Sequence, residues 1–187
     1  YYAGESTIEL LNLSNLDAFT IGNHEFDWGL DTVSNYNDGN EENGEADFPF
    51  LGANIYYKGT TDIPDFIDPY TIIEKGEHKI GIIGTIGSGL EYSIAQSRID
   101  DYEFGSPSDA VEEYSYYLRT EENCDIIIVL AHDGGTSLNI IVTNLEGDYR
   151  VDAVFNGHTH STYTRLTNDV PVIQSGDNGE FVGYLRW

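Results

Sequence analysis

The chain carries the stretch Gly22-Asn23-His24-Glu25-Phe26-Asp27-Trp28-Gly29 directly after the mainly apolar residues 17–21. The apolar run predicts a buried strand that stops at the glycine. In α/β proteins, side chains at the carboxyl end of such a strand lie where ligands and catalytic groups collect. Asn23 offers a neutral oxygen ligand for a divalent ion, and His24 can donate a proton while Asp27 holds its other ring nitrogen. The alternative interpretation is an ordinary turn, in which Asn, Gly and Asp are common.

Three more of the five histidines also follow predicted strands. His132 comes after one apolar run, and His158 and His160 come after the next one. In an extended segment, side chains two residues apart point to the same side, so the last two imidazoles could serve one metal ion or two neighbouring ions. Each segment taken alone also fits exposed loop histidines. His78 lies in a charged turn and is interpreted as a solvated surface residue.

Short apolar runs alternate with helical stretches along the chain, a pattern typical of an α/β fold. The helix signals are Ile8 with Leu11 on one face, a Ser106 cap followed by Pro107, and an apolar stretch at 138–145. Residues 35–47, rich in Asn, Gly and acids, predict a surface loop. We predict strands at residues 17–21, 50–55, 70–73, 79–86, 126–130, 151–155, 170–175 and 181–187.

The composition limits the partners of the chain. Eight basic residues face 33 acidic ones, for a formal charge of −25. A field of that sign repels nucleic-acid backbones and anionic membranes, so we expect no nucleic-acid partner. No run approaches the roughly 20 apolar residues of a membrane span, and 187 residues fit one domain. Cys124 is the single cysteine, beside an apolar run, and is expected to be a small buried hydrophobe.

The segments GNHEFDWG (22–29), AHDGG (131–135) and NGHTHS (156–161) resemble, in order and spacing, the calcineurin-like metallophosphoesterases. Residues 16–27 and 48–55 are especially similar to the branch of 5'-nucleotidases and 2',3'-cyclic-nucleotide phosphodiesterases. The resemblance implies a four-layer α/β/β/α sandwich with two divalent metal ions at the strand ends. Zn, Mn, Co or a similar ion would fill these positions, and the sequence does not choose among them.

The resemblance also implies which residues hold the metals. Asn23, His132 and His158 match ligands of the second metal. His160 matches a ligand of the first metal, at a place where some relatives carry Gln. No residue of the chain is matched to substrate binding.

His24 matches the catalytic histidine that stabilises the transition state and protonates the leaving alkoxide, and Asp27 matches its acidic partner. The implied reaction is hydrolysis of a phosphate ester, most simply of a nucleotide, through in-line attack by a metal-activated water. Two bound cations would make the pocket locally positive, so the acidic surface is no obstacle to an anionic substrate.

The sequence departs from the family pattern at its first metal. Relatives supply that metal through an Asp-x-His and a bridging Asp in a Gly-Asp segment, and we find neither in the chain. We expect both upstream of Tyr1, so that residues 1–187 form a metallophosphoesterase domain without its first strands. The first metal then keeps only His160, and we expect the chain by itself to be impaired. The C-terminal domain that binds the nucleoside in 5'-nucleotidases is also expected elsewhere.

Other hypotheses remain open at this stage. Relatives with the same segments act on UDP-sugars or cyclic nucleotides, and these residues do not separate them. A non-catalytic surface or adhesion module is a second class, although intact histidine segments argue against decay of the site. A glycine-rich phosphate loop at residues 84–89 lacks the Gly-Lys-Ser/Thr ending of a P-loop. The acid-rich, lysine-poor composition favours an extracellular, periplasmic or cell-surface location.

Overall fold

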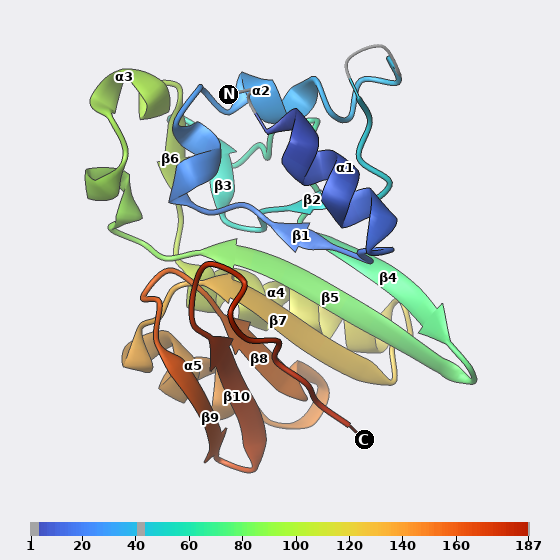
Figure 1. Ribbon diagram of the computed structural model, residues 1–187. Helices are drawn as coiled ribbons and strands as arrows, with labels where there is room; N and C mark the ends of the chain where they lie inside the picture. The colour runs from blue at the N-terminus through green and yellow to red at the C-terminus, as the bar shows by residue number, and fades with distance from the viewer. Residues whose placement is uncertain (1–3, 41–43, 187) are drawn as a thin grey trace.

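A six-stranded sheet in the order β4-β5-β7-β8-β10-β9 forms the centre of the structure (Figure 1). The structure is a computed structural model that describes residues 4–40 and 44–186. The four inner strands run parallel, and the two edge strands run antiparallel to their neighbours. The strands are β4 (Tyr70–Lys75), β5 (His78–Ile86), β7 (Ile126–His132), β8 (Ala153–Asn156), β10 (Val170–Ser175) and β9 (Thr162–Thr167).

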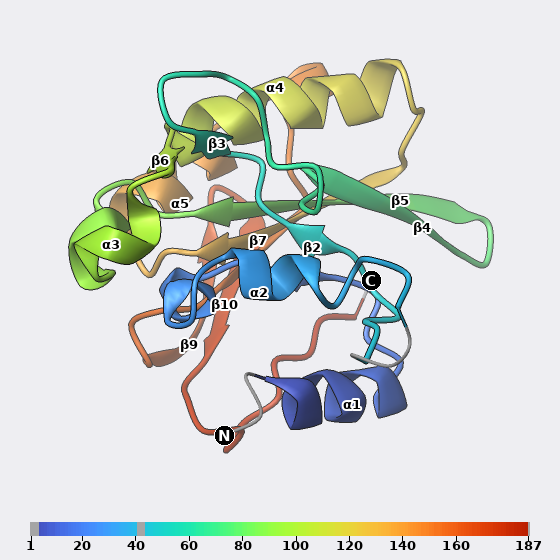
Figure 2. The ribbon, with the colours of Figure 1, turned by 90° about the horizontal axis from the view of Figure 1, so that it is seen from above.

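A second, smaller sheet lies on one face of the central sheet. It consists of β1 (Phe19–Thr20) and β2 (Phe50–Leu51), which pair in parallel and contact β5. Helices α1 (Glu5–Leu13) and α2 (Asp31–Ser34) lie outside the small sheet, and α4 (Pro107–Thr120) lies on the opposite face of the central sheet (Figure 2). The order helix, sheet, sheet, helix confirms the predicted α/β/β/α layers.

The remaining helices and strands lie around the two sheets. Helix α5 (Thr136–Thr143) contacts α4 beside the central sheet. Strands β3 (Ile55–Tyr57) and β6 (Tyr102–Phe104) form a separate antiparallel pair. The short helices are α3 (Gln96–Ile99) and the 3-10 turns η1 (Asn23–Phe26), η3 (Leu90–Ser93) and η4 (Gly147–Tyr149). Within the described residues, no helix is both long enough and apolar enough to cross a membrane.

A small apolar cluster of Ala18, Leu51 and Ile82 joins the two sheets, and two larger cores pack the helices against them. One lies between α4 and the central sheet, where Val111 and Leu118 pack near Ile127 with no exposed surface. The other lies between the small sheet and the outer helices, and it includes Phe26 of η1 at 0% exposure. Burying a large apolar side chain stabilises a fold by roughly 1.5–3 kcal/mol. Phe26 therefore anchors the polar turn that carries Asn23 and His24.

Several predictions from the sequence are confirmed. Helix α4 starts at Pro107, and the Ser106 hydroxyl caps it by accepting the Asp109 N–H at 3.3 Å. The predicted strands 79–86 and 126–130 are the neighbours β5 and β7. Cys124 is a buried free thiol, and His78 is exposed. The described parts of the predicted loop, 35–40 and 44–47, contain no helix or strand.

Other predictions were wrong in extent. The predicted strand 50–55 is two strands, because the chain leaves the small sheet after Leu51. At the break, the fully buried Asn54 side chain accepts from the Ile86 N–H at 3.0 Å and donates to the carbonyls of Ile86 and Gly105. The predicted strand 17–21 pairs over two residues.

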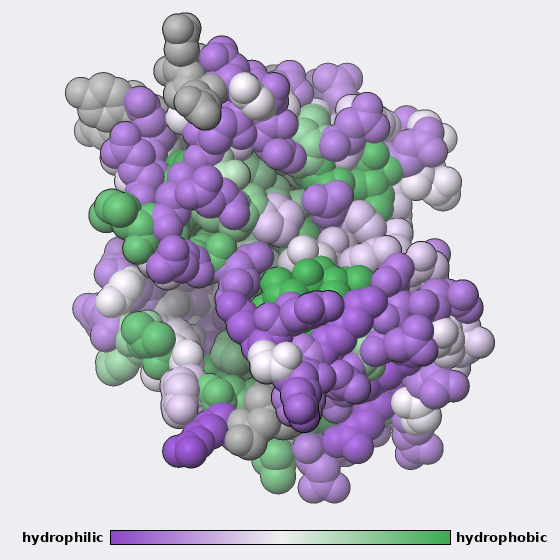
Figure 3. Space-filling view, turned by 90° about the vertical axis from the view of Figure 1, so that its right-hand side faces the viewer, coloured by the Kyte–Doolittle hydropathy of each residue, from purple (hydrophilic) through white to green (hydrophobic). Residues whose placement is uncertain are grey.

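The predicted final strand is also wrong. Residues 181–186 form no strand, and residue 187 lies outside the described residues. Strand β9, which the apolar pattern did not indicate, is instead the edge strand paired with β10. Hydrophilic side chains cover most of the face in Figure 3, as the charge of −25 requires, and apolar side chains gather near its middle.

Candidate metal and catalytic site

Three segments that are far apart in the chain meet at the ends of strands. Asn23 opens η1 just after β1, His132 is the last residue of β7, and His158 follows β8. Strands β7 and β8 are neighbours in the central sheet, and β1 packs against β7. The fold therefore brings together the three side chains that the sequence singled out separately.

The Asn23 side-chain oxygen is the centre of this group. It lies 2.8 Å from Nε2 of His132 and 3.2 Å from Nδ1 of His158. The two imidazole rings meet edge to face, with their centroids 5.2 Å apart. Asn23 is 6% exposed, so this oxygen is held inside the structure and not on a mobile surface side chain. One ring nitrogen of each histidine thus contacts the same Asn23 oxygen.

The distances from the Asn23 oxygen to the two ring nitrogens match those between neighbouring ligands of a metal ion. Bonds of about 2.0–2.2 Å from a divalent ion to nitrogen and oxygen place neighbouring ligand atoms about 3 Å apart. The distances from the Asn23 oxygen to the two nitrogens, 2.8 Å and 3.2 Å, lie on either side of this value. Within the described ranges, no three His, Cys, Asp or Glu side chains form such a group by themselves, so a site here would need the amide oxygen as its third donor. The residues present fit one divalent cation.

The electrostatics of His132 suit a neutral nitrogen ligand. Burial, and to a lesser extent the nearby His158, His24 and His160, lower the pKa of His132 to about 4. A metal ligand must offer an unprotonated nitrogen, and His132 does so at neutral pH without losing a proton. The other three histidines therefore lie close enough to His132 to act on its charge.

Close approach of backbone segments explains two glycines of the site. A Cβ atom at Gly22 would lie 2.6 Å from Cε1 and Nδ1 of His132, so the imidazole occupies the space of a side chain. A Cβ atom at Gly134 would overlap the Thr159 side chain. The loop after β7 is therefore packed directly against the loop after β8.

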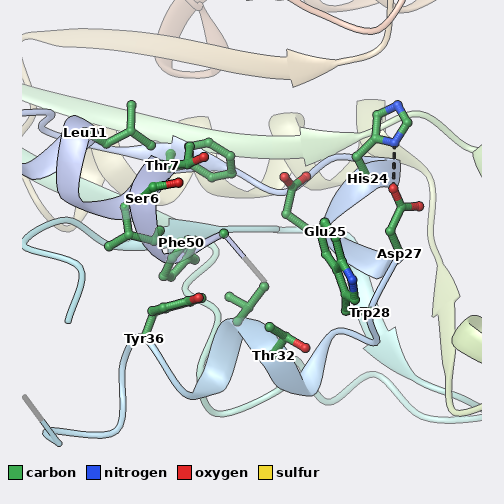
Figure 4. A pocket seen from close by; sticks show the side chains of 14 residues that line it. Ser6, Thr7, Leu11, His24, Glu25, Asp27, Trp28, Thr32, Tyr36 and Phe50 are labelled. Carbon is green, nitrogen blue, oxygen red and sulfur yellow. Dashed lines mark hydrogen bonds and ion pairs between the residues drawn. The ribbon is translucent and has the colours of Figure 1, made fainter. Parts of the chain in front are cut away.

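His24 and Asp27 form an exposed pair beside the three candidate ligands. His24 Nδ1 lies 3.0 Å from Asp27 Oδ2, and the two side chains are 73% and 53% exposed. Figure 4 shows the pair at one end of a cavity of about 370 Å³, with the second ring nitrogen of His24 directed away from the labelled apolar side chains. The pair is accessible to solvent and to a ligand.

The loop that carries His158 and His160 is bent, and the expectation of an extended segment was wrong. Both residues have left-handed backbone angles, with φ of 70° and 56°. Such angles cost a non-glycine residue roughly 1–2 kcal/mol. The two side chains separate as a result: His158 faces Asn23, whereas His160 is 64% exposed and lies 3.4 Å from Asp177.

Two supporting residues carry no signal in the sequence. Glu25 accepts the Gly22 N–H at 2.7 Å, and burial raises the pKa of its carboxyl group. Gln174 of β10 is 2% exposed and bonds to the loop after β8. A Gln in an apolar strand and a Glu in a polar turn are unremarkable one by one, because their partners come from distant residues or the backbone.

Comparison with known proteins finds relatives that match nearly the whole chain. The chain is 30% identical over its whole length to a snake venom 5'-nucleotidase of Naja atra, covering 37% of it. It is 27% identical over 94% of its length to a cell wall protein of Listeria monocytogenes, covering 26% of it. The chain thus spans about a third or less of these curated relatives.

The fold also matches a solved structure. The structure of a 5'-nucleotidase precursor from Thermus thermophilus aligns with 94% of the chain at a TM-score of 0.74 and 20% identity. The aligned part is 36% of the Thermus protein. The family model described as calcineurin-like phosphoesterase matches residues 4–162, which include all six candidate site residues. The chain belongs to the calcineurin-like phosphoesterase family.

Proposed function

We propose that residues 1–187 form a metallophosphoesterase domain that hydrolyses phosphate esters, most simply the 5'-phosphate of nucleotides. The observation that carries the proposal is the convergence of His132 and His158 on the buried Asn23 oxygen, beside the exposed His24–Asp27 pair. A cation position next to an accessible histidine is the arrangement that phosphate hydrolysis needs.

Calcineurin-like phosphoesterases use divalent metal ions. A bound divalent cation supplies a water of lowered pKa and neutralises charge on phosphate oxygens. In this proposal, Asn23, His132 and His158 hold one such ion, and His160 contributes to a second. His160 turns away from Asn23 and lies beside Asp177, whereas His158 contacts Asn23. This separation supports two metal positions and not one. We propose Zn, Mn or Co, because imidazole and amide ligands suit these ions.

His24 is the proposed acid. The Asp27 carboxylate accepts a hydrogen bond from Nδ1–H, which fixes the tautomer and leaves Nε2 for the substrate. The carboxylate also stabilises the charged imidazolium, so that His24 can stabilise negative charge and give a proton to the leaving oxygen. Its exposure supports contact with a substrate that approaches from solvent.

The relatives support the proposed substrate and location. Proteins named as 5'-nucleotidases support a nucleotide substrate, and parts of the protein beyond this chain would supply base recognition. Related hydrolases of UDP-sugars or cyclic nucleotides are the alternative within the same class. The venom and cell wall relatives support an extracellular or cell-surface location.

The proposal is tested on the full-length gene product in which residues 1–187 occur. Phosphate release from AMP is measured with added MnCl₂, against the His24→Ala variant and against chelator. Metal-dependent release that the substitution abolishes is the expected result. A correctly folded, metal-loaded protein that releases no phosphate from AMP, UDP-sugars or cyclic nucleotides contradicts it and favours a non-catalytic surface module.

A further inference from the structure

The connection between β8 and β9 crosses the end of β10. Strand β10 lies between β8 and β9 in the central sheet, parallel to the first and antiparallel to the second. The connecting residues 157–161, here called the histidine loop, must therefore pass over the carboxyl end of β10. Gln174 lies at that end, in register with Asn156 of β8 and Tyr163 of β9.

The Gln174 side chain bonds to the histidine loop at three points. Its Oε1 accepts the Thr159 hydroxyl at 2.7 Å and the Ser161 N–H at 3.0 Å. Its Nε2 donates to the Gly157 carbonyl. The Ser161 amide is an obligatory donor and the Gly157 carbonyl an obligatory acceptor, so the backbone fixes which way the amide points. At 2% exposure, no water can replace these partners at low cost.

The histidine loop needs such support, because its two histidines are the residues in left-handed conformation. Non-glycine residues hold these angles only where surrounding contacts fix them. Gln174 binds the residue before His158, the residue between the histidines, and the residue after His160. The three bonds therefore bracket both strained positions.

We propose that Gln174 is the positioning residue that holds the histidine loop in the bend that turns His158 toward Asn23 and His160 away from it. The metal-binding part of this inference rests on the proposed function. The loop-holding part depends only on the three hydrogen bonds. Supporting partners of metal ligands typically change metal affinity ten- to hundredfold when they are removed.

The test uses the 187-residue chain with Gln174→Met, which keeps the length of the side chain and removes its hydrogen bonds. Ser115→Ala is the matched control, since it removes a fully buried hydroxyl from α4, away from the loop. We expect the Ser161 amide to exchange with solvent at least tenfold faster in Gln174→Met. The apparent affinity for Co²⁺, followed by its visible absorption, is expected to fall ten- to hundredfold. Neither quantity should change in the control.

A second variant protects the test from loss of the fold. Gln174→Glu keeps acceptors for Thr159 and Ser161 and loses the donor to Gly157, so the Ser161 amide should stay protected there. Unchanged Ser161 exchange in Gln174→Met overturns the proposal, and faster exchange with unchanged Co²⁺ affinity overturns its metal-binding part. A wild-type chain that binds no Co²⁺ at millimolar concentration contradicts the proposed function. In that case, faster Ser161 exchange in Gln174→Met than in wild type still supports the loop-holding role.

Discussion

His132 and His158 approach the same side-chain oxygen of Asn23, at 2.8 Å and 3.2 Å, from the ends of two neighbouring strands. The asparagine belongs to the turn after the small sheet, 109 and 135 residues earlier in the chain. One amide oxygen therefore links the two sheets at the point where their strands end. If this point holds a cation, the asparagine is the ligand on which the geometry depends.

Removing the Asn23 side-chain oxygen should lower the affinity for metal more than it lowers the stability of the fold. Asn23→Ala leaves His132 and His158 without their shared partner and takes away one of three candidate ligands. We expect Co²⁺ affinity, measured by calorimetry on the 187-residue chain, to fall at least tenfold. Asn23→Asp, which retains the oxygen and adds a charge, serves as the control and should keep binding. Equal affinity in wild type and Asn23→Ala would remove the asparagine from the ligand set.

Substitution of the proposed acid should separate catalysis from metal binding. In the full-length gene product, we expect His24→Ala to lower kcat about 10²- to 10⁴-fold, the usual contribution of general acid catalysis. The His24 side chain is exposed and contacts Asp27, so the fold should stay intact. Metal content, measured by elemental analysis, should match wild type. A variant with normal kcat would show that His24 is no acid in this reaction.

A glycine of the site gives a steric test. Gly22→Ala would bring a Cβ atom to 2.6 Å from the His132 ring, which must then move away from Asn23. We expect a loss of Co²⁺ affinity together with reduced thermal stability. Gly59→Ala is the control, because Gly59 has φ of 75° and open space around its Cβ position. That variant should lose stability through backbone strain and keep its metal affinity; equal affinity in Gly22→Ala contradicts the packing described here.

Alkaline unfolding tests the packing of the central sheet. Burial and the neighbouring Tyr117 raise the pKa of Tyr70 to about 12, above its ordinary value of 10. The neutral phenol is thus favoured in the folded state, and the stability it contributes is present below pH 10 and lost as the pH rises toward 12. We expect the free energy of unfolding of Tyr70→Phe to fall less steeply across this window than that of wild type.

Urea titrations at pH 9 and pH 11.5 give the two free energies for each protein. Tyr92→Phe is the control, since Tyr92 is 96% exposed, and its pH dependence should follow wild type. The half-buried Tyr70 ring packs against Tyr114 and Tyr117 of α4. Identical slopes for Tyr70→Phe and wild type would contradict this packing.

The parts of the fold that the sequence predicted are those with a local cause. Strand β7 is a continuous run of β-branched and apolar residues, and α4 begins with a capping serine and a proline at its first position. The break after Leu51 was not predictable in this way. It depends on Asn54 bonding to Ile86, 32 residues away, and no local pattern encodes that partner.

The candidate site, too, was predicted only where its cause is local. Histidines at the ends of predicted strands pointed to His132 and His158, because strand ends gather at one edge of a sheet. The bend at His160 was missed, since it follows from β10 inserting between β8 and β9, a pairing decided by residues 162–175. Gln174 becomes visible as a supporting residue only once that insertion is known.

The most direct test of the central claim is an anomalous scattering map from crystals of the 187-residue chain grown or soaked with CoCl₂. The claim predicts a cobalt peak within bonding distance, about 2.0–2.2 Å, of the Asn23 oxygen, His132 Nε2 and His158 Nδ1. The peak should disappear in crystals of Asn23→Ala. Cobalt bound elsewhere, with these three atoms still bonded only to one another, would contradict the account.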